Sequence, residues 1–75
     1  MLVNMLKLGK YRHYKGKDYE VIGVGKLEAT LEDVVIYRPL YKSEYSLWVR
    51  PLAVFTENVE IDGKTMPRFE YIGDL

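Results

Sequence analysis

Short runs of β-branched and aromatic residues alternate with closely spaced turn signals along most of this chain. Asp62-Gly63 between two short runs is a strong β-hairpin signal, and Gly16 is expected at positive φ in a turn over 15–18. Such spacing is typical of a small all-β protein. The runs that we predict as strands are 9–14, 19–26, 34–41, 47–50, 59–61, 64–66 and 68–72.

Two features of the predicted strands indicate a strongly bent sheet. Gly23 and Gly25 lie inside one strand, where glycine usually marks a bulge or bend. Pro51 begins a segment, 51–55, that favours a single helical or 3₁₀ turn. We predict five or six antiparallel strands that close into an SH3-like barrel, with 27–33 as a connection. The alternative is an open antiparallel sheet with one short helix at 27–33.

The chain must be stabilised by apolar packing. It has 75 residues and no cysteine, so we expect one domain with no disulfide. Residues 1–8 are expected to form an N-terminal extension and residues 9–75 the β domain. Hydrophobic residues make up 48% of the chain and include seven Tyr, two Phe and one Trp, which is enough to build a core. The predicted core residues are Tyr19, Val21, Val34, Ile36, Leu40, Trp48, Leu52, Phe55, Val59, Phe69 and Ile72.

The charges cancel overall but are unevenly distributed. Eleven basic residues oppose eleven acidic ones, which argues against a general polyanion-binding protein. Residues 1–17 carry five basic residues and no acid, whereas residues 18–36 carry five acids and one Lys. Residues 37–50 are again mainly basic. Either oppositely charged strands pair across the sheet, or the two basic blocks form one basic face.

Catalytic residue combinations are almost absent. His13 is the only histidine, no cysteine is present, and Ser43 and Ser46 have no histidine near them in the sequence. Gly23-Val24-Gly25 lacks the remaining residues of a phosphate-binding loop. We therefore predict no catalytic residues, no metal site and no cofactor. A small enzyme that uses His13 as a general base is kept as a minor alternative.

No segment approaches the roughly 20 apolar residues of a membrane-spanning helix. The first residues do not resemble a secretory signal. Because the chain also lacks cysteine, we expect it in the cytoplasm.

Aromatic and basic residues are interleaved at several places in the chain. Small barrels bind oligonucleotides and peptides on such surfaces, because bases stack on rings and Arg pairs with phosphate or carboxylate. The alternative is that the rings belong to the core and that Arg50 and Arg68 pair with Glu57, Glu70 or Asp74. The interleaved set is Tyr11, Arg12, His13, Tyr14, Lys15, Tyr37, Arg38, Tyr41, Trp48, Arg50 and Arg68.

Several of these segments together resemble one family. They are YRHYKG at 11–16, YEV at 19–21, VIYRPLY at 35–41, LWVRPL at 47–52 followed by Phe55, and Gly63 followed by PRF at 67–69. The chain resembles the DUF1653 family of short bacterial proteins over residues 9–72. The resemblance implies a small β-rich, SH3-like domain and no established reaction, substrate or cofactor. It singles out Arg12, His13, Tyr14, Tyr37, Arg38, Trp48, Arg50 and Arg68 as candidate ligand-binding residues.

The chain departs from the family pattern at one segment. The family has a His-Ser/Thr-Glu-Thr-Leu-Glu pattern before its Val-Val-Tyr strand, and Leu27 and Ala29 replace the His and the first Glu here. Thr30 and Glu32 are retained. Any role of the two replaced groups in relatives is therefore not expected in this chain.

We expect a binding module for nucleic acid or a nucleotide-like planar anion, because basic residues are interleaved with Tyr and Trp. The alternative partner is a peptide or protein subunit, which the zero net charge and high aromatic content favour. The relative positions of Arg12, His13, Arg50 and Arg68 distinguish one shared site from separate structural roles.

Overall fold

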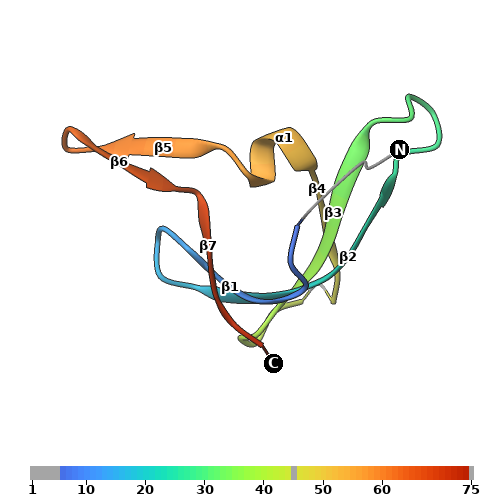
Figure 1. The fold of residues 1–75 in the computed structure, drawn as a ribbon. Coiled ribbons are helices and arrows are strands. Elements are labelled where there is room, and N and C mark those ends of the chain that lie inside the picture. The colour runs from blue at the N-terminus through green and yellow to red at the C-terminus, as the bar shows by residue number, and fades with distance from the viewer. Residues whose placement is uncertain (1–5, 45, 75) are drawn as a thin grey trace.

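The computed structural model describes residues 6–44 and 46–74 and contains two antiparallel sheets (Figure 1). The larger sheet has five strands in the order β4-β3-β2-β1-β7, and β5 and β6 form a separate hairpin that projects beyond it. The prediction of an antiparallel all-β protein is confirmed. The elements are β1 (Gly9–His13), β2 (Asp18–Lys26), β3 (Asp33–Pro39), β4 (Trp48–Pro51), α1 (Leu52–Phe55), β5 (Asn58–Ile61), β6 (Lys64–Pro67) and β7 (Phe69–Gly73).

The strand arrangement differs from the prediction of one sheet with five or six strands. The described residues form seven strands in two sheets, because the Asp62-Gly63 hairpin pairs only with itself. Strands β4 and β7 are the two ends of the larger sheet, so its closure into an SH3-like barrel stays a prediction. The helical turn predicted at 51–55 is confirmed as α1, which follows Pro51.

The alternative helix at 27–33 does not form. Leu27 accepts backbone hydrogen bonds from Thr30 and Leu31, which makes a single turn. Leu31 then has a φ of 63°, outside the right-handed helical region, and the chain enters β3 at Asp33. No helix formed by the described residues is long and apolar enough to span a membrane.

Two register shifts bend the larger sheet. One lies in β2 between Val21 and Gly23 and the other in β1 between Lys10 and Tyr11. Bulges of this kind increase the local twist of a strand, so the glycine at position 23 marks a bend as expected. The bent sheet has an inner face, which packs against α1, and an outer face.

The core lies on the inner face. It is formed by Tyr11, Val21, Val35, Tyr37, Phe55 and Phe69, and Leu6, Tyr19, Leu52 and Tyr71 pack against it. Phe55 is 1% exposed, and its ring stacks on that of Phe69 with the centroids 4.1 Å apart. Tyr11 and Tyr37 direct their edges at Phe55. Aromatic packing is therefore the main stabilising contribution of this small interior.

The predicted core was right for Val21, Val34, Phe55 and Phe69 and wrong at two positions. Leu40 is 37% exposed because β3 ends before it, and Trp48 is 38% exposed because β4 is an edge strand. Ile36, Val59 and Ile72 are only half-buried.

Sequence reasoning also missed three buried residues, namely Tyr11, Val35 and Tyr37. Both faces of β3 are apolar, so its alternation does not indicate which face is buried. The buried face is determined by the strand register, which pairs Tyr37 with the buried Val21.

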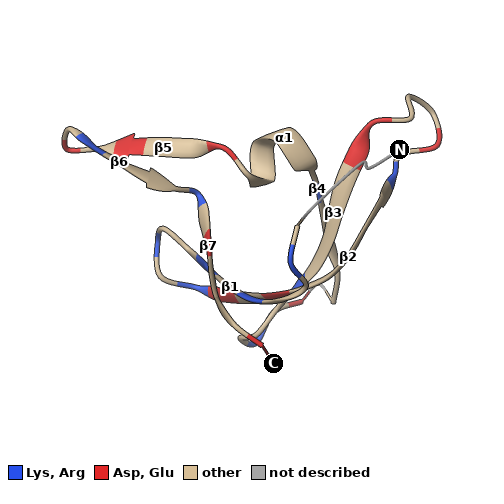
Figure 2. Ribbon diagram, viewed as in Figure 1, with Lys and Arg blue, Asp and Glu red and all other residues tan. Residues whose placement is uncertain are grey.

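Basic and acidic positions lie on neighbouring strands of the larger sheet (Figure 2), and several of them pair across the strands. Arg12 faces Asp18, and Arg38 faces Glu20, with N–O distances of 2.8 and 2.6 Å. The cross-strand interpretation of the uneven charge is confirmed for these pairs. Each exposed pair contributes about 0–1 kcal/mol, so the pairs cancel charge more than they stabilise the fold.

Candidate functional site

Phe69 is the buried centre of the candidate site. Strand β7 pairs with β1 so that Phe69 faces His13, and the His13 ring meets Phe69 edge-on with a centroid distance of 4.9 Å. The rings of Tyr19 and Tyr37 also meet Phe69 edge-on, at 5.7 and 5.6 Å. One face of Phe69 is occupied by Phe55.

Arg50 joins this cluster from the edge strand β4. Its Cζ atom lies 5.4 Å from the Phe69 centroid, over the ring, and its Nε–H donates to the hydroxyl of Tyr37 at 3.2 Å. The strand register pairs Arg50 with Val35 and Trp48 with Tyr37, so both side chains lie on the inner face. A cation over an aromatic face is attracted by the negative potential of the ring.

A hollow of about 230 Å³ opens beside Arg50. It is lined by Tyr19, Tyr37, Trp48 and Arg50. Burial raises the pKa of the Tyr19 phenol, and so does the 2.8 Å hydrogen bond between its hydroxyl and that of Tyr41. Tyr19 therefore stays neutral and supplies no negative charge to balance Arg50. We call this space the Trp48 hollow.

Arg50 differs from the other three arginines in having no carboxylate partner among the described residues. Arg12 pairs with Asp18, Arg38 with Glu20, and Arg68 with Glu57. Within residues 6–44 and 46–74, no carboxylate lies within ion-pair distance of Arg50, whose bonded partner is the phenol of Tyr37. The guanidinium of Arg50 is thus a positive charge that the described residues do not neutralise.

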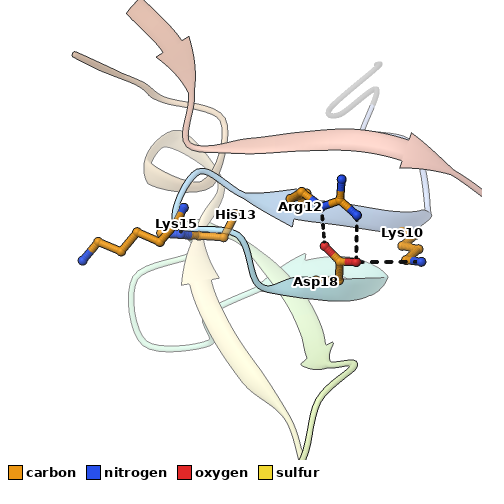
Figure 3. A network of polar contacts seen from close by, with 5 residues as sticks. All are labelled: Lys10, Arg12, His13, Lys15 and Asp18. Carbon is orange, nitrogen blue, oxygen red and sulfur yellow. Dashed lines mark hydrogen bonds and ion pairs between the residues drawn. The ribbon is translucent and has the colours of Figure 1, made fainter. Parts of the chain in front are cut away.

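His13 lies among other positive charges. Burial lowers its pKa, and the charges of Arg50, Lys15 and Arg68 lower it further. The backbone N–H of Lys15 donates to His13 Nδ1 at 3.1 Å, beside the Arg12–Asp18 pair (Figure 3). Because Nδ1 accepts this bond, the neutral ring carries its proton on Nε2 and presents a donor there. The nitrogen that would serve as a general base is already occupied.

A second hollow of about 200 Å³ lies at the β1–β2 turn, and we call it the Tyr14 hollow. Its lining consists of Arg12, His13, Tyr14, Gly16, Met66, Pro67 and Glu70. The rings of His13 and Tyr14 lie 4.5 Å apart with an interplanar angle of 31°. Met66 and Pro67 of β6 supply an apolar wall. This hollow also combines ring faces with cations, since Lys15 Nζ lies 5.8 Å from the Tyr14 centroid.

The comparisons with known proteins agree with this fold. The model of the family described as "Protein of unknown function (DUF1653)" matches residues 9–71. The chain belongs to the DUF1653 family. It is also similar to the crystal structure of a DUF1653 protein from Bordetella bronchiseptica, with 35% identity and a TM-score of 0.87. The alignment covers 93% of this chain and 91% of that one. No protein of curated function matches this chain.

Most of the predicted site residues of this DUF1653 domain lie on the inner side of the sheet. His13, Arg50 and Tyr37 contact Phe69, Trp48 lines the hollow beside them, and Tyr14 packs on His13. The positive charge of Arg68 contributes to the lowered pKa of His13. The described residues contain no group of three or more His, Cys, Asp or Glu side chains that could hold a metal ion.

Two of the predicted site residues lie elsewhere. Arg38 points to the outer face and pairs with Glu20. Arg12 pairs with Asp18 on the same face and reaches only the rim of the Tyr14 hollow. Sequence reasoning placed Tyr19 and Phe69 only in the core, whereas Tyr19 lines the site and Phe69 supports it. The sequence did offer one signal for a site role, because both residues lie in segments that resemble the family.

We expect the His13 imidazole to titrate below its ordinary pKa of 6.5. The unfolded chain then binds this proton at a higher pH than the folded chain does. The stability that neutral His13 contributes is therefore present above pH 6.5 and is lost as the pH falls through the folded-state pKa. Proton NMR of the single imidazole against pH measures the midpoint, and Arg50→Gln is expected to move it upward. A midpoint at or above 6.5 would contradict the described surroundings of His13.

Proposed function

We propose that this domain binds single-stranded nucleic acid or a nucleotide-like planar anion at the Trp48 hollow. The observation that carries the proposal is Arg50, a guanidinium without a carboxylate partner among the described residues, held beside aromatic rings. Arg forms strong charge-assisted hydrogen bonds to phosphate. Aromatic side chains provide stacking surfaces for bases of any sequence.

The local charge supports this proposal even though the net charge is zero. Acidic partners offset the charge of many basic residues, including Arg12, Arg38 and Lys26. Lys15, Arg50 and Arg68 instead add their positive potential at His13, although Arg68 is also paired with Glu57. A local positive potential at Arg50 and around His13 attracts an anion without making the whole protein basic.

The size of the hollow indicates what part of a ligand it takes. At about 230 Å³ it is smaller than the 300–1,000 Å³ of typical small-molecule pockets. It suits one planar ring next to Trp48, with the anionic group of the ligand at Arg50. The expected cytoplasmic location fits a nucleic-acid partner.

Removing the Arg50 charge is expected to weaken binding at least about tenfold, because a hydrogen-bonded charge contributes about 1.5–3 kcal/mol. Arg50→Gln is compared with Arg38→Gln, which removes the same charge from the outer face and should change affinity less than about twofold. Binding of labelled single-stranded RNA and DNA is followed by fluorescence anisotropy at about 50 and 200 mM salt. Melting curves confirm that both variants are folded.

Two outcomes would contradict the proposal. One is the absence of binding at low salt, because phosphate contacts must strengthen as salt is removed. The other is an equal loss of affinity in Arg50→Gln and Arg38→Gln, which would mean that only total charge matters.

A specific observation also favours a protein partner on the outer face. Ile22, Leu47 and Val49 are 44, 55 and 58% exposed, and the adjacent β4 is an edge strand. An open edge beside apolar side chains can accept a strand from a peptide or another subunit. Such binding would be insensitive to Arg50→Gln, which separates it from the first proposal. We propose no enzymatic role for His13, because its acceptor nitrogen already accepts a hydrogen bond from the Lys15 amide.

A further inference from the structure

The Trp48 hollow and the Tyr14 hollow each have a lining residue close to the ring of Phe69. His13, which lines the Tyr14 hollow, has its ring centroid 4.9 Å from that of Phe69. Arg50, which lines the Trp48 hollow, has its Cζ atom 5.4 Å from the same centroid. Phe69 is itself 6% exposed, so it forms a buried support for both of these residues.

Hydrogen-bond donors are available on both of these residues. Only Nε of the Arg50 guanidinium has an acceptor among the described residues, which leaves both terminal NH₂ groups without one. The Nε2–H of neutral His13 has no bonded acceptor in residues 6–44 and 46–74 either, and the hydrogen bond of this ring to the Lys15 amide uses Nδ1. The positive charges of Lys15 and Arg68 also act on His13, whereas Glu70 supplies a carboxylate to the lining of the Tyr14 hollow.

The two hollows offer similar chemistry to a ligand. The Trp48 hollow is lined by the aromatic side chains of Tyr19, Tyr37 and Trp48. The Tyr14 hollow has the rings of His13 and Tyr14 and the apolar Met66–Pro67 wall. Each has a volume of about 200 Å³ or slightly more, so each suits one planar ring and neither suits a longer folded ligand.

From this arrangement we infer that the ligand is an extended single strand that places one base in each hollow, with the intervening phosphate at Arg50 and His13. The inference rests on the proposed function and specifies its ligand, because a single nucleotide would leave one hollow empty. An acidic peptide would satisfy the cations but not the ring surfaces, so the geometry favours the nucleic acid.

The experiment compares ligands of different length on wild-type protein and on variants of each hollow. The probes are uridine monophosphate, a hexa-uridylate and a hexaglutamate peptide, and binding is followed by NMR shifts of backbone amides. We expect the hexa-uridylate to bind at least about tenfold more tightly than the monophosphate, since a second stacked base adds its own contact.

Variants of the two hollows test the assignment of a base to each. Tyr14→Leu is expected to weaken hexa-uridylate binding about fivefold or more and monophosphate binding by less, because only the longer ligand must use both hollows. Tyr14→Phe, which keeps the ring, is expected to retain wild-type affinity. Trp48→Leu is expected to weaken both nucleotide ligands. Melting curves verify that the variants remain folded.

The possible results separate the inference from the proposed function. If the monophosphate binds in an Arg50-dependent way but the hexa-uridylate gains nothing, the two-hollow inference is overturned and the proposed function stands. Equal affinity of Tyr14→Leu and wild type for hexa-uridylate overturns it as well. If hexaglutamate binds as tightly as hexa-uridylate, the inferred ligand class is wrong. If neither nucleotide ligand binds at low salt, both proposals fail.

Discussion

Replacing Phe55 with alanine is expected to cost about 3–5 kcal/mol of unfolding free energy, the range for truncating a buried Phe. Phe55 is 1% exposed and stacks on Phe69 with a centroid distance of 4.1 Å. Tyr11 and Tyr37 meet it edge-on, so the cavity would be lined by three rings that cannot easily collapse into it. A 75-residue domain has about 4–11 kcal/mol of total stability. The variant would therefore be close to unfolding.

Urea denaturation followed by circular dichroism measures this loss. Leu8→Ala is the control, because Leu8 is 56% exposed and its truncation should change stability by less than about 0.5 kcal/mol. Phe55→Leu should lie between the two, since it keeps part of the buried volume. A Phe55→Ala protein within about 1 kcal/mol of wild type would show that the interior is not organised around this ring.

Gly9→Ala is expected to cost about 2–4 kcal/mol, through positive-φ strain of about 1–2 kcal/mol plus steric overlap. Gly9 has a φ of 135°, and an added Cβ would lie 2.8 Å from the carbonyl oxygen of Gly73 and 3.2 Å from Cε1 of Tyr71. The carbonyl belongs to the backbone of the paired strand β7, so it cannot move aside without disturbing the sheet. The pairing that places Phe69 beside His13 would be weakened.

Gly73→Ala separates the two causes. Its φ of 138° is nearly the same, but nothing lies within 4 Å of the added Cβ. We expect Gly73→Ala to lower the free energy of unfolding only by the strain of the positive φ, about 1–2 kcal/mol. Chemical denaturation of both variants gives the difference, which measures the overlap with the Gly73 carbonyl. Equal losses would contradict the close approach of β1 and β7 at this point.

The parts of the fold that the sequence predicted best depend on local backbone preferences. Gly16 has a φ of 102°, and Asp62 and Gly63 have φ values of 52° and 79°, as a two-residue hairpin turn requires. Pro51 directly precedes α1 as its N-cap residue, so the helical turn starts where the proline predicted it. Such preferences act within a few residues, so they can be read without knowing the rest of the molecule.

The candidate site shows where this reasoning ends. Arg38 and Arg50 each precede a proline, and both were predicted to bind a ligand. In the folded chain Arg38 pairs with Glu20 on the outer face, whereas Arg50 lies over Phe69 on the inner face. Their local sequences do not distinguish them. The register between strands does, because successive residues of a strand point to opposite faces.

The sequence by itself determined the turn positions, the antiparallel all-β class and a set of basic and aromatic residues that includes most of the candidate site. Only the tertiary structure decided which faces those residues occupy. Tyr37 is buried because it is paired with Val21, and the shift that follows at Gly23 changes the alignment of the next residues. Each such alignment is set by contacts between strands distant in sequence. The burial of Tyr37, the exposure of Trp48 and the carboxylate-free surroundings of Arg50 all depend on it.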